Sequence, residues 1–299
     1  MNDVHVDEEA TQKSCSRGQA EELYRLKEQI DLQENLFGIR NKIVVLSGKG
    51  GVGKSSVAAN LAVALSLQGK KTGLLDVDLH GPSIPTLLGI EGQFPPSDGG
   101  RISPVEYNAN LKVMSVGLLL RDQADALVWR GPAKHGVIKQ FLSSVVWGEL
   151  DYLIVDCPPG TGDEPLSVIQ LLEGAEGAIV VTTPQDVALT DVRKSITFCR
   201  QMKLPVVGVV ENMSGFVCPH CGEEVDIFKS GGGKTMAGEM KVPFLGQIPL
   251  DPAMVDCGDG GEPLVEHQAD SPTARAFGKV VTAVTEWRGA GNSATGGEL

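Results

Sequence analysis

The segment that most constrains this chain is the glycine-rich run Gly48-Lys49-Gly50-Gly51-Val52-Gly53-Lys54-Ser55. A strand-like apolar run, residues 43–46, precedes it, and a helical pattern over residues 55–61 follows it. In such a strand-to-helix turn, glycines let backbone N–H groups converge on phosphate oxygens without a Cβ in the way. The start of the helix adds roughly half a positive charge at the same point. The segment therefore predicts a polyphosphate-binding turn.

The rest of the chain alternates short apolar runs with helical patterns. We expect strands at Lys42–Ser47, Thr72–Asp76, Leu111–Val116, Tyr152–Asp156, Ala178–Thr182, Val206–Glu211 and Phe244–Ile248. We expect helices at Lys54–Gln68, Ala133–Val146, Pro165–Leu172 and Val187–Met202, among others. The strands are rich in Val, Ile and Leu without strict polar alternation, which is typical of strands covered on both faces. This order predicts an α/β fold with a doubly wound, mainly parallel sheet.

We expect one domain over residues 19–288, between a disordered tail at 1–18 and a mobile tail at 289–299. An amphipathic helix, with Leu23, Leu26, Ile30 and Leu36 on its apolar face, should pack on the main body. An insertion near 214–228 contains a C-x-x-C pair.

The net charge of −12 disfavours general adhesion to nucleic acid or to anionic membranes. No secretory signal or run of 18 apolar residues is present in the sequence, so we expect a cytoplasmic protein with no nucleic-acid or membrane partner.

Inside the glycine-rich run, each polar residue has a predicted role toward ATP and magnesium. Lys54 should neutralise the β- and γ-phosphates, and the Ser55 hydroxyl should hold Mg²⁺, with Ser56 beside it. The additional lysine, Lys49, makes the run similar to the deviant Walker A motif of the ATPases that include MinD, ParA, ArsA and the nitrogenase iron protein. That resemblance implies that Lys49 reaches the partner's nucleotide across a dimer interface. The alternative is a solvated loop lysine.

Three carboxylates follow strands of the predicted sheet. Asp76 and Asp78 come after one strand and Asp156 after another, so all three should point into the crevice at the carboxyl ends of the strands. One acid should help hold the magnesium water shell and another should orient the attacking water. Any one of them could instead be a turn former.

The class resemblance assigns these positions more narrowly. It implies that Asp156 is the Walker B acid, that Asp78 positions water and that Asp76 lies near the metal. It also implies that residues 160–162 sense the γ-phosphate. Lys49, Lys54, Asp78 and Asp156 then form the predicted catalytic set. For the adenine, the class uses an Asn at a late strand end, here Asn212, and backbone after the last strand, here Pro249 to Asp251.

The pair Cys218 and Cys221 has three interpretations: a redox dithiol, structural thiols or half of a metal site. The following acids Glu223 and Glu224 oppose thiolate formation, which disfavours the redox interpretation. A metal with four sulfur ligands needs two more cysteines, and a two-fold axis supplies them from a second subunit. Four thiolates suit zinc or an iron–sulfur cluster.

Several segments together resemble the Mrp/ApbC-type iron–sulfur cluster carrier ATPases. They are residues 48–56, 76–85 (DVDLHGPSIP), 156–163 (DCPPGTGD) and 211–214 (ENMS) leading to the C-x-x-C. The resemblance implies a homodimer that hydrolyses ATP and carries a 4Fe–4S cluster bridged by Cys218 and Cys221 of both subunits. It also implies delivery of the cluster to apoprotein acceptors.

The N-terminal region offers only Cys15, so we do not expect a second, N-terminal cluster. Two alternatives stay open: a MinD/ParA-like positioning ATPase, although the tail after Trp287 lacks a basic amphipathic helix, and a zinc-stabilised, nucleotide-dependent scaffold.

Overall fold

The computed structural model describes residues 22–23, 26–27, 29–119, 131–172, 174–218, 221 and 223–287. The predicted tails at 1–18 and 289–299 lie outside the described residues, as does Cys15.

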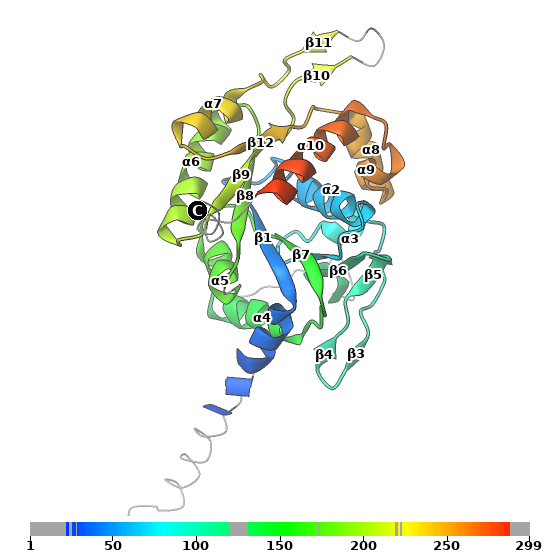
Figure 1. Cartoon of the computed structure of the whole chain (residues 1–299), viewed down its shortest axis with the longest axis vertical. Helices are drawn as coiled ribbons and strands as arrows, with labels where there is room; N and C mark the ends of the chain where they lie inside the picture. Colours follow the sequence, from blue (N-terminus) through cyan, green and yellow to red (C-terminus); the bar gives the residue numbers. More distant parts are fainter. Residues whose placement is uncertain are drawn as a thin grey trace, which may run out of the picture.

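The centre of the molecule is an eight-stranded sheet in the order β12-β9-β8-β1-β7-β2-β6-β5 (Figure 1). Seven of its strands pair in parallel, and β5 joins the edge antiparallel to β6. The strands are β1 (Ile39–Ser47), β2 (Thr72–Asp76), β5 (Val105–Asn108), β6 (Leu111–Ser115), β7 (Leu150–Asp156), β8 (Gly177–Thr182), β9 (Val206–Glu211) and β12 (Phe244–Gln247). Two small hairpins lie outside this sheet, β3 (Ser97–Asp98) with β4 (Arg101–Ile102), and β10 (Phe216–Val217) with β11 (Glu224–Val225).

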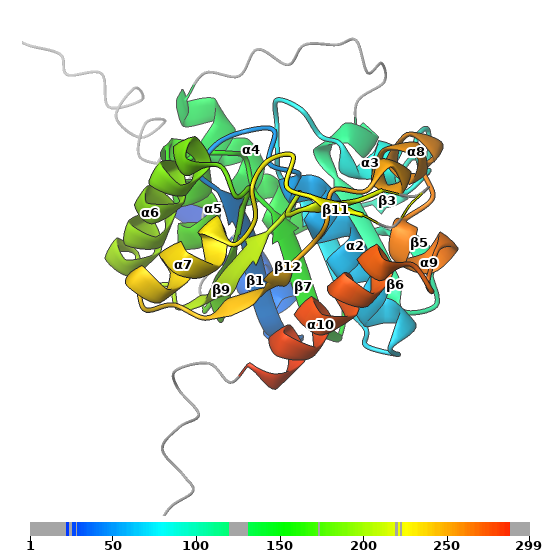
Figure 2. The ribbon, with the colours of Figure 1, turned by 90° about the horizontal axis from the view of Figure 1, so that it is seen from above.

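Helices cover both faces of the sheet (Figure 2). One face carries α2 (Lys54–Leu67), α3 (Ile84–Leu87), α8 (Pro252–Gly260), α9 (Leu264–His267) and α10 (Pro272–Glu286), and the other carries α4 (Gly131–Ser144), α5 (Asp163–Leu171), α6 (Asp186–Gln201) and α7 (Gly232–Glu239). A short 3₁₀ helix, Val116–Leu119, follows β6. Because both faces are covered, the central strands are buried along almost their whole length, as their unbroken apolar sequences predicted.

The core lies on both sides of this sheet. Helices α2 and α10 pack against each other and against the same face of the sheet, where Leu61, Leu65, Phe277 and Val281 belong to one buried cluster. The opposite face buries a second cluster around Trp147, which is fully covered. The doubly wound α/β fold expected from the sequence is therefore confirmed.

The helix before the sheet differs from the prediction. Residues 29–37 are helical, and Leu32 and Leu36 are buried against the body. Leu23, Leu26 and Ile30 are exposed by 69, 55 and 46 %, so the prediction that they pack on the body is wrong. In Figure 1 this helix extends away from the body, so only its last turns have a surface to pack on.

None of the helices among the described residues is long and apolar enough to cross a membrane.

Candidate functional site

The glycine-rich run forms the turn between β1 and α2, at the carboxyl ends of the parallel strands. Gly51 and Gly53 both have a φ of +78°, a conformation that only glycine adopts at little cost. The turn lines a cavity of 230 Å³ together with Lys54, Ser55, Ser56 and Asp78. Within the described residues, a Cβ added at Gly50 or Gly51 would meet no atom, so the turn leaves space on its outer side.

Other glycines of the run fit against their surroundings with no room for a side chain. A Cβ on Gly48 would lie 2.5 Å from the carbonyl carbon of Asp191 in α6. A Cβ on Gly53 would lie 2.2 Å from Nδ2 of Asn212, and that amide donates a hydrogen bond of 2.9 Å to the carbonyl of Val52. The turn is therefore held from outside by α6 and by the end of β9.

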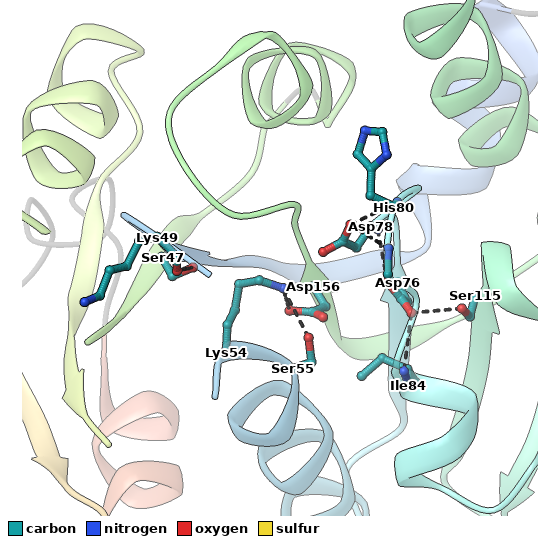
Figure 3. Close-up of polar contacts among 11 residues, drawn as sticks. Ser47, Lys49, Lys54, Ser55, Asp76, Asp78, His80, Ile84, Ser115 and Asp156 are labelled. Carbon is teal, nitrogen blue, oxygen red and sulfur yellow. Dashed lines mark hydrogen bonds and ion pairs between the residues drawn. The ribbon is translucent and has the colours of Figure 1, made fainter. Parts of the chain in front are cut away.

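Lys54 forms a buried ion pair with Asp156 at the floor of the cavity (Figure 3). The lysine is 6 % exposed and the carboxylate is fully buried. Lys54 Nζ also lies 3.3 Å from Ser55 Oγ. The second carboxylate oxygen, Asp156 Oδ2, is buried with no hydrogen-bond partner among the described residues. An unsatisfied buried oxygen beside a serine hydroxyl suits the water shell of Mg²⁺, so these residues fit that ion.

Asp76 lies directly opposite Asp156, because β2 and β7 pair in register with these two residues as partners. Asp76 accepts hydrogen bonds from Ser115 Oγ at 2.9 Å, from the N–H of Asp78 at 3.0 Å and from the N–H of Ile84 at 3.4 Å. Burial, reinforced by the neighbouring Asp156 charge, raises the pKa of Asp76 to about 7. Burial also raises the pKa of Asp156, and the Lys54 ammonium opposes that effect.

Asp78 lines the same cavity from the loop that follows β2. Its Oδ1 accepts from the backbone N–H groups of His80 at 3.2 Å and Gly81 at 3.3 Å. It also lines a neighbouring cavity of 610 Å³ that includes Asp163 and Glu164 at the start of α5. In that second cavity His80 Nε2 lies 3.2 Å from the Glu164 carboxylate. Asp78 therefore lies between the phosphate-binding turn and the segment that follows β7.

Lys49 is half-buried at the rim of the cavity, and its side chain points away from Lys54 and Asp156 (Figure 3). Its ammonium is thus not directed at the phosphate-binding end of its own site. The backbone carbonyl of Lys49 accepts a hydrogen bond of 2.9 Å from Ser47 Oγ, which fixes the turn beneath it.

The residues predicted to contact adenine lie at the ends of two neighbouring strands, β9 and β12. Pro249 and Asp251 follow β12, next to the end of β9 that carries Asn212. The Asp251 side chain caps α8 through the N–H of Ala253 and accepts a hydrogen bond of 2.5 Å from Thr273. The main chain of this segment is partly engaged as well, because the N–H of Leu250 donates to Gly215 O at 2.8 Å and the carbonyl of Asp251 accepts from the N–H of Met254 at 3.0 Å.

The cysteine pair lies on the β10–β11 hairpin, which projects from the body of the protein (Figure 1). Cys218 is half-buried and Cys221 is exposed, and the apolar Val217, Val225 and Ile227 beside them are exposed by 42 to 52 %. Within the described part of the chain, no group of three or more His, Cys, Asp or Glu residues is arranged to hold a metal ion. One chain thus presents two sulfurs at a projecting surface.

The other described cysteines lie inside the protein. Burial raises the pKa of the Cys157 and Cys199 thiols, so both stay protonated at neutral pH. Cys199 is a buried position of α6, as expected from the sequence.

Two residues at the strand ends were not anticipated from the sequence. Ser115 ends β6 and binds Asp76, and Glu211 ends β9 fully buried, where it accepts hydrogen bonds from residues on both sides of the cysteine hairpin. In both cases the sequence signal is a polar residue at the end of an apolar strand.

Comparisons with known proteins agree with this geometry. The ParA-type family of NUBPL iron-transfer P-loop NTPases matches residues 38–285. An iron-sulfur cluster carrier protein of Methanocaldococcus jannaschii is 50 % identical over 255 residues, covering 85 % of this chain and 87 % of the relative. A cytosolic Fe-S cluster assembly factor NUBP2 homolog of Nematostella vectensis is 50 % identical over 256 residues, covering 84 % and 95 %.

Solved structures show the same fold. An Archaeoglobus fulgidus nucleotide-binding protein in complex with ADP superposes with a TM-score of 0.72 at 41 % identity, covering 83 % of this chain and 96 % of that one. The cell division ATPase MinD of Pyrococcus furiosus gives a TM-score of 0.61 at 27 % identity, with 82 % and 98 % covered. On this sequence and structural similarity, the chain belongs to the family of NUBPL iron-transfer P-loop NTPases.

Proposed function

We propose that this protein hydrolyses ATP and carries a 4Fe–4S cluster to apoprotein acceptors as a homodimer. The observation that carries the proposal is the placement of Cys218 and Cys221. They lie on a hairpin that projects from a nucleotide-binding core and present half of a four-sulfur site. The similarity to proteins named as an iron-sulfur cluster carrier and an Fe-S cluster assembly factor supports this cargo.

Binding of ATP begins with an exchange of partners at Lys54. Its ammonium pairs with Asp156 in the floor of the cavity. When phosphates enter, Lys54 turns to the β- and γ-phosphate oxygens, and the backbone N–H groups of residues 48–53 surround them. Asp156 is then left beside Ser55, with Asp76 behind it, and these three groups would hold Mg²⁺ and its water shell. The ion supplies charge neutralisation to the phosphates.

The hydrolytic step needs a water in line with the γ-phosphate and a cationic group beside the negatively charged phosphoryl group that is transferred. We assign the first task to Asp78, whose carboxylate lines the cavity opposite the turn. We assign the second to Lys49 of a second subunit, because in its own chain this side chain points away from Lys54. We assign the adenine contacts to Asn212 and to the main chain of residues 249–251.

A two-fold axis brings two hairpins together and completes the cluster site. Each chain contributes Cys218 and Cys221, and the exposed Val217, Val225 and Ile227 become covered by the partner. The cluster is cargo, so its ligands must be accessible to an acceptor, as the exposure of Cys221 allows. We place the protein in the cytoplasm, as the name of the Nematostella relative suggests.

Anaerobic reconstitution with ferrous and ferric iron and sulfide tests the proposal. We expect about four iron and four sulfide atoms per two chains, and thiolate-to-iron absorption bands. Cys218→Ala should lose both, while Cys257→Ala, which removes a buried thiol of α8 away from the hairpin, should keep them. Retention of tightly bound zinc with no iron uptake would contradict the cargo and favour the structural-zinc alternative.

A further inference from the structure

We propose that Glu211 is a positioning residue that fixes the cysteine hairpin (residues 215–229) on the nucleotide-binding core. With Asn212 it transmits nucleotide occupancy from the phosphate-binding turn to the two cysteines. The inference rests on the proposed function for the role of those cysteines, and its path is defined by hydrogen bonds between the two sites.

Glu211 joins the two ends of the hairpin through one carboxylate. It ends β9 and is fully buried. Its Oε1 accepts from Ser214 Oγ at 2.5 Å, before the hairpin, and from the N–H of Gly231 at 2.8 Å, after it. Its Oε2 accepts from the N–H of Gly233. A single buried anion therefore joins the segment that enters the hairpin to the segment that leaves it.

Gln247 closes the same network from the end of β12. Its Nε2 lies 3.0 Å from Glu211 Oε1, 2.9 Å from Ser214 Oγ and 3.2 Å from Ser230 Oγ. The Ser214 and Ser230 hydroxyls are themselves 3.2 Å apart. The base of the hairpin is thus fixed to two neighbouring strands of the sheet.

A carboxylate is the group this position requires. The N–H groups of Gly231 and Gly233, which donate to Glu211, lie at the start of α7, where the helix dipole favours a negative charge. Gly231 has a φ of +82°, and a Cβ on Gly233 would lie 2.8 Å from Glu211 Oε2, so both glycines allow the backbone to approach the anion. An amide in place of the carboxylate would direct an N–H group at one of these donors.

The next residue in the chain reaches the phosphate-binding turn. Asn212 Nδ2 donates to the carbonyl of Val52, and the backbone N–H of Asn212 donates to Thr182 O at 2.7 Å. Asn212 also packs on Gly53, with no space between them for a Cβ. A shift of the turn on phosphate binding therefore displaces Asn212, and with it Glu211 and the hairpin base. Contiguous hydrogen-bonded groups of this kind are the ordinary carriers of coupling between sites.

The test is site-resolved alkylation of Cys218 and Cys221 by iodoacetamide in the metal-free full chain, with and without Mg²⁺ and a non-hydrolysable ATP analogue. In the unmodified protein we expect the nucleotide to change the rate at one or both cysteines by about fivefold or more, as for ordinary allosteric coupling. In Glu211→Gln the ratio of the alkylation rates with and without nucleotide should fall to within about twofold of unity. The analogue should still bind, because the substitution removes hydrogen bonds at the hairpin base and none at the phosphate-binding turn.

Two further variants make the outcome decisive. Glu239→Gln changes an exposed carboxylate of α7 that pairs with Arg193, and it should keep the full ratio. Gln247→Ala removes an exposed side chain of the network, and it should reduce the ratio even if Glu211→Gln fails to fold. A folded Glu211→Gln or Gln247→Ala variant with the full ratio overturns the inference, as does a ratio of unity in the unmodified protein.

The cargo assignment can fail separately. If reconstitution yields no cluster but alkylation depends on nucleotide through Glu211, the proposed function falls and the coupling stands. If a cluster forms and the effect of nucleotide on the alkylation rate does not depend on Glu211, the proposed function stands and the coupling through Glu211 falls.

Discussion

Replacement of Asp76 by Asn should make the nucleotide-free protein more stable at alkaline pH and should remove part of its pH dependence. Asp76 is fully buried opposite Asp156, and its pKa rises from 3.8 to about 7 on folding. Between these two values the unfolded chain has released its proton while the folded protein retains it. The folded state therefore binds more protons, and stability falls as the pH rises through this window.

The size of the effect follows from the two pKa values. Each pH unit between them corresponds to about 1.4 kcal/mol, so ionisation of Asp76 costs the folded state about 4 kcal/mol above pH 7. The Asn oxygen can accept from the N–H of Asp78, and its amide can donate to the Ser115 hydroxyl, which is free to rotate. Asn loses the long hydrogen bond from the N–H of Ile84. That loss costs about 1 kcal/mol. The variant should thus be about 3 kcal/mol more stable at pH 8 and nearly equal to the unmodified protein at pH 5.

Urea unfolding at pH 5 and pH 8, followed by circular dichroism with chelator present and nucleotide absent, measures this difference. Asp98→Asn, an exposed carboxylate on β3, controls for the removal of one negative charge. A stability difference between Asp76→Asn and the unmodified protein that is the same at both pH values would refute the reasoning. The same variant should hydrolyse ATP more slowly, because an amide holds a magnesium water shell less well than a carboxylate.

Two further predictions concern the phosphate-binding turn. Gly53→Ala should abolish nucleotide binding and lower the free energy of unfolding by about 1–2 kcal/mol or more, because the new Cβ occupies a positive-φ position against the Asn212 amide. Unchanged nucleotide affinity in equilibrium titration would contradict this prediction. Lys49→Gln should leave nucleotide affinity within a few-fold but lower kcat by about a thousandfold, the lower range for a cationic finger supplied in trans. Restored turnover in mixed dimers with a Lys54→Ala chain would support action across the interface, and an unchanged kcat would argue against it.

Much of the site could be predicted because its determinants are local in the sequence. The phosphate-binding turn needs glycines at fixed spacing between a strand and a helix, and residues 48–55 satisfy that requirement without reference to the rest of the chain. Asp76 and Asp156 could be placed in one crevice because acids that end parallel strands meet at one edge of the sheet, and here the two are register partners. The apolar strand runs likewise identified the central sheet.

The residues that escaped prediction depend on contacts between distant segments. Glu211 ends an apolar strand, but its role arises only because α7 and the hairpin return to the end of β9. The edge strand β5 is a short polar segment, VEYN, that becomes a strand only by pairing with β6. For the helix before β1, periodicity identified an apolar face but gave no information on where the body ends, so Leu23 and Leu26 were assigned contacts they do not make.

The central claim is that a nucleotide polyphosphate is bound by the turn at residues 48–55, and calorimetric titration of Lys54→Ala with MgADP tests it most directly. Charged hydrogen bonds contribute about 1.5–3 kcal/mol each, so loss of the Lys54 ammonium should weaken binding by about tenfold to a hundredfold. Lys70→Ala, which removes an exposed lysine beyond the end of α2, should bind like the unmodified protein. Equal affinity of Lys54→Ala and the unmodified protein would contradict the account, because the nucleotide would then bind elsewhere.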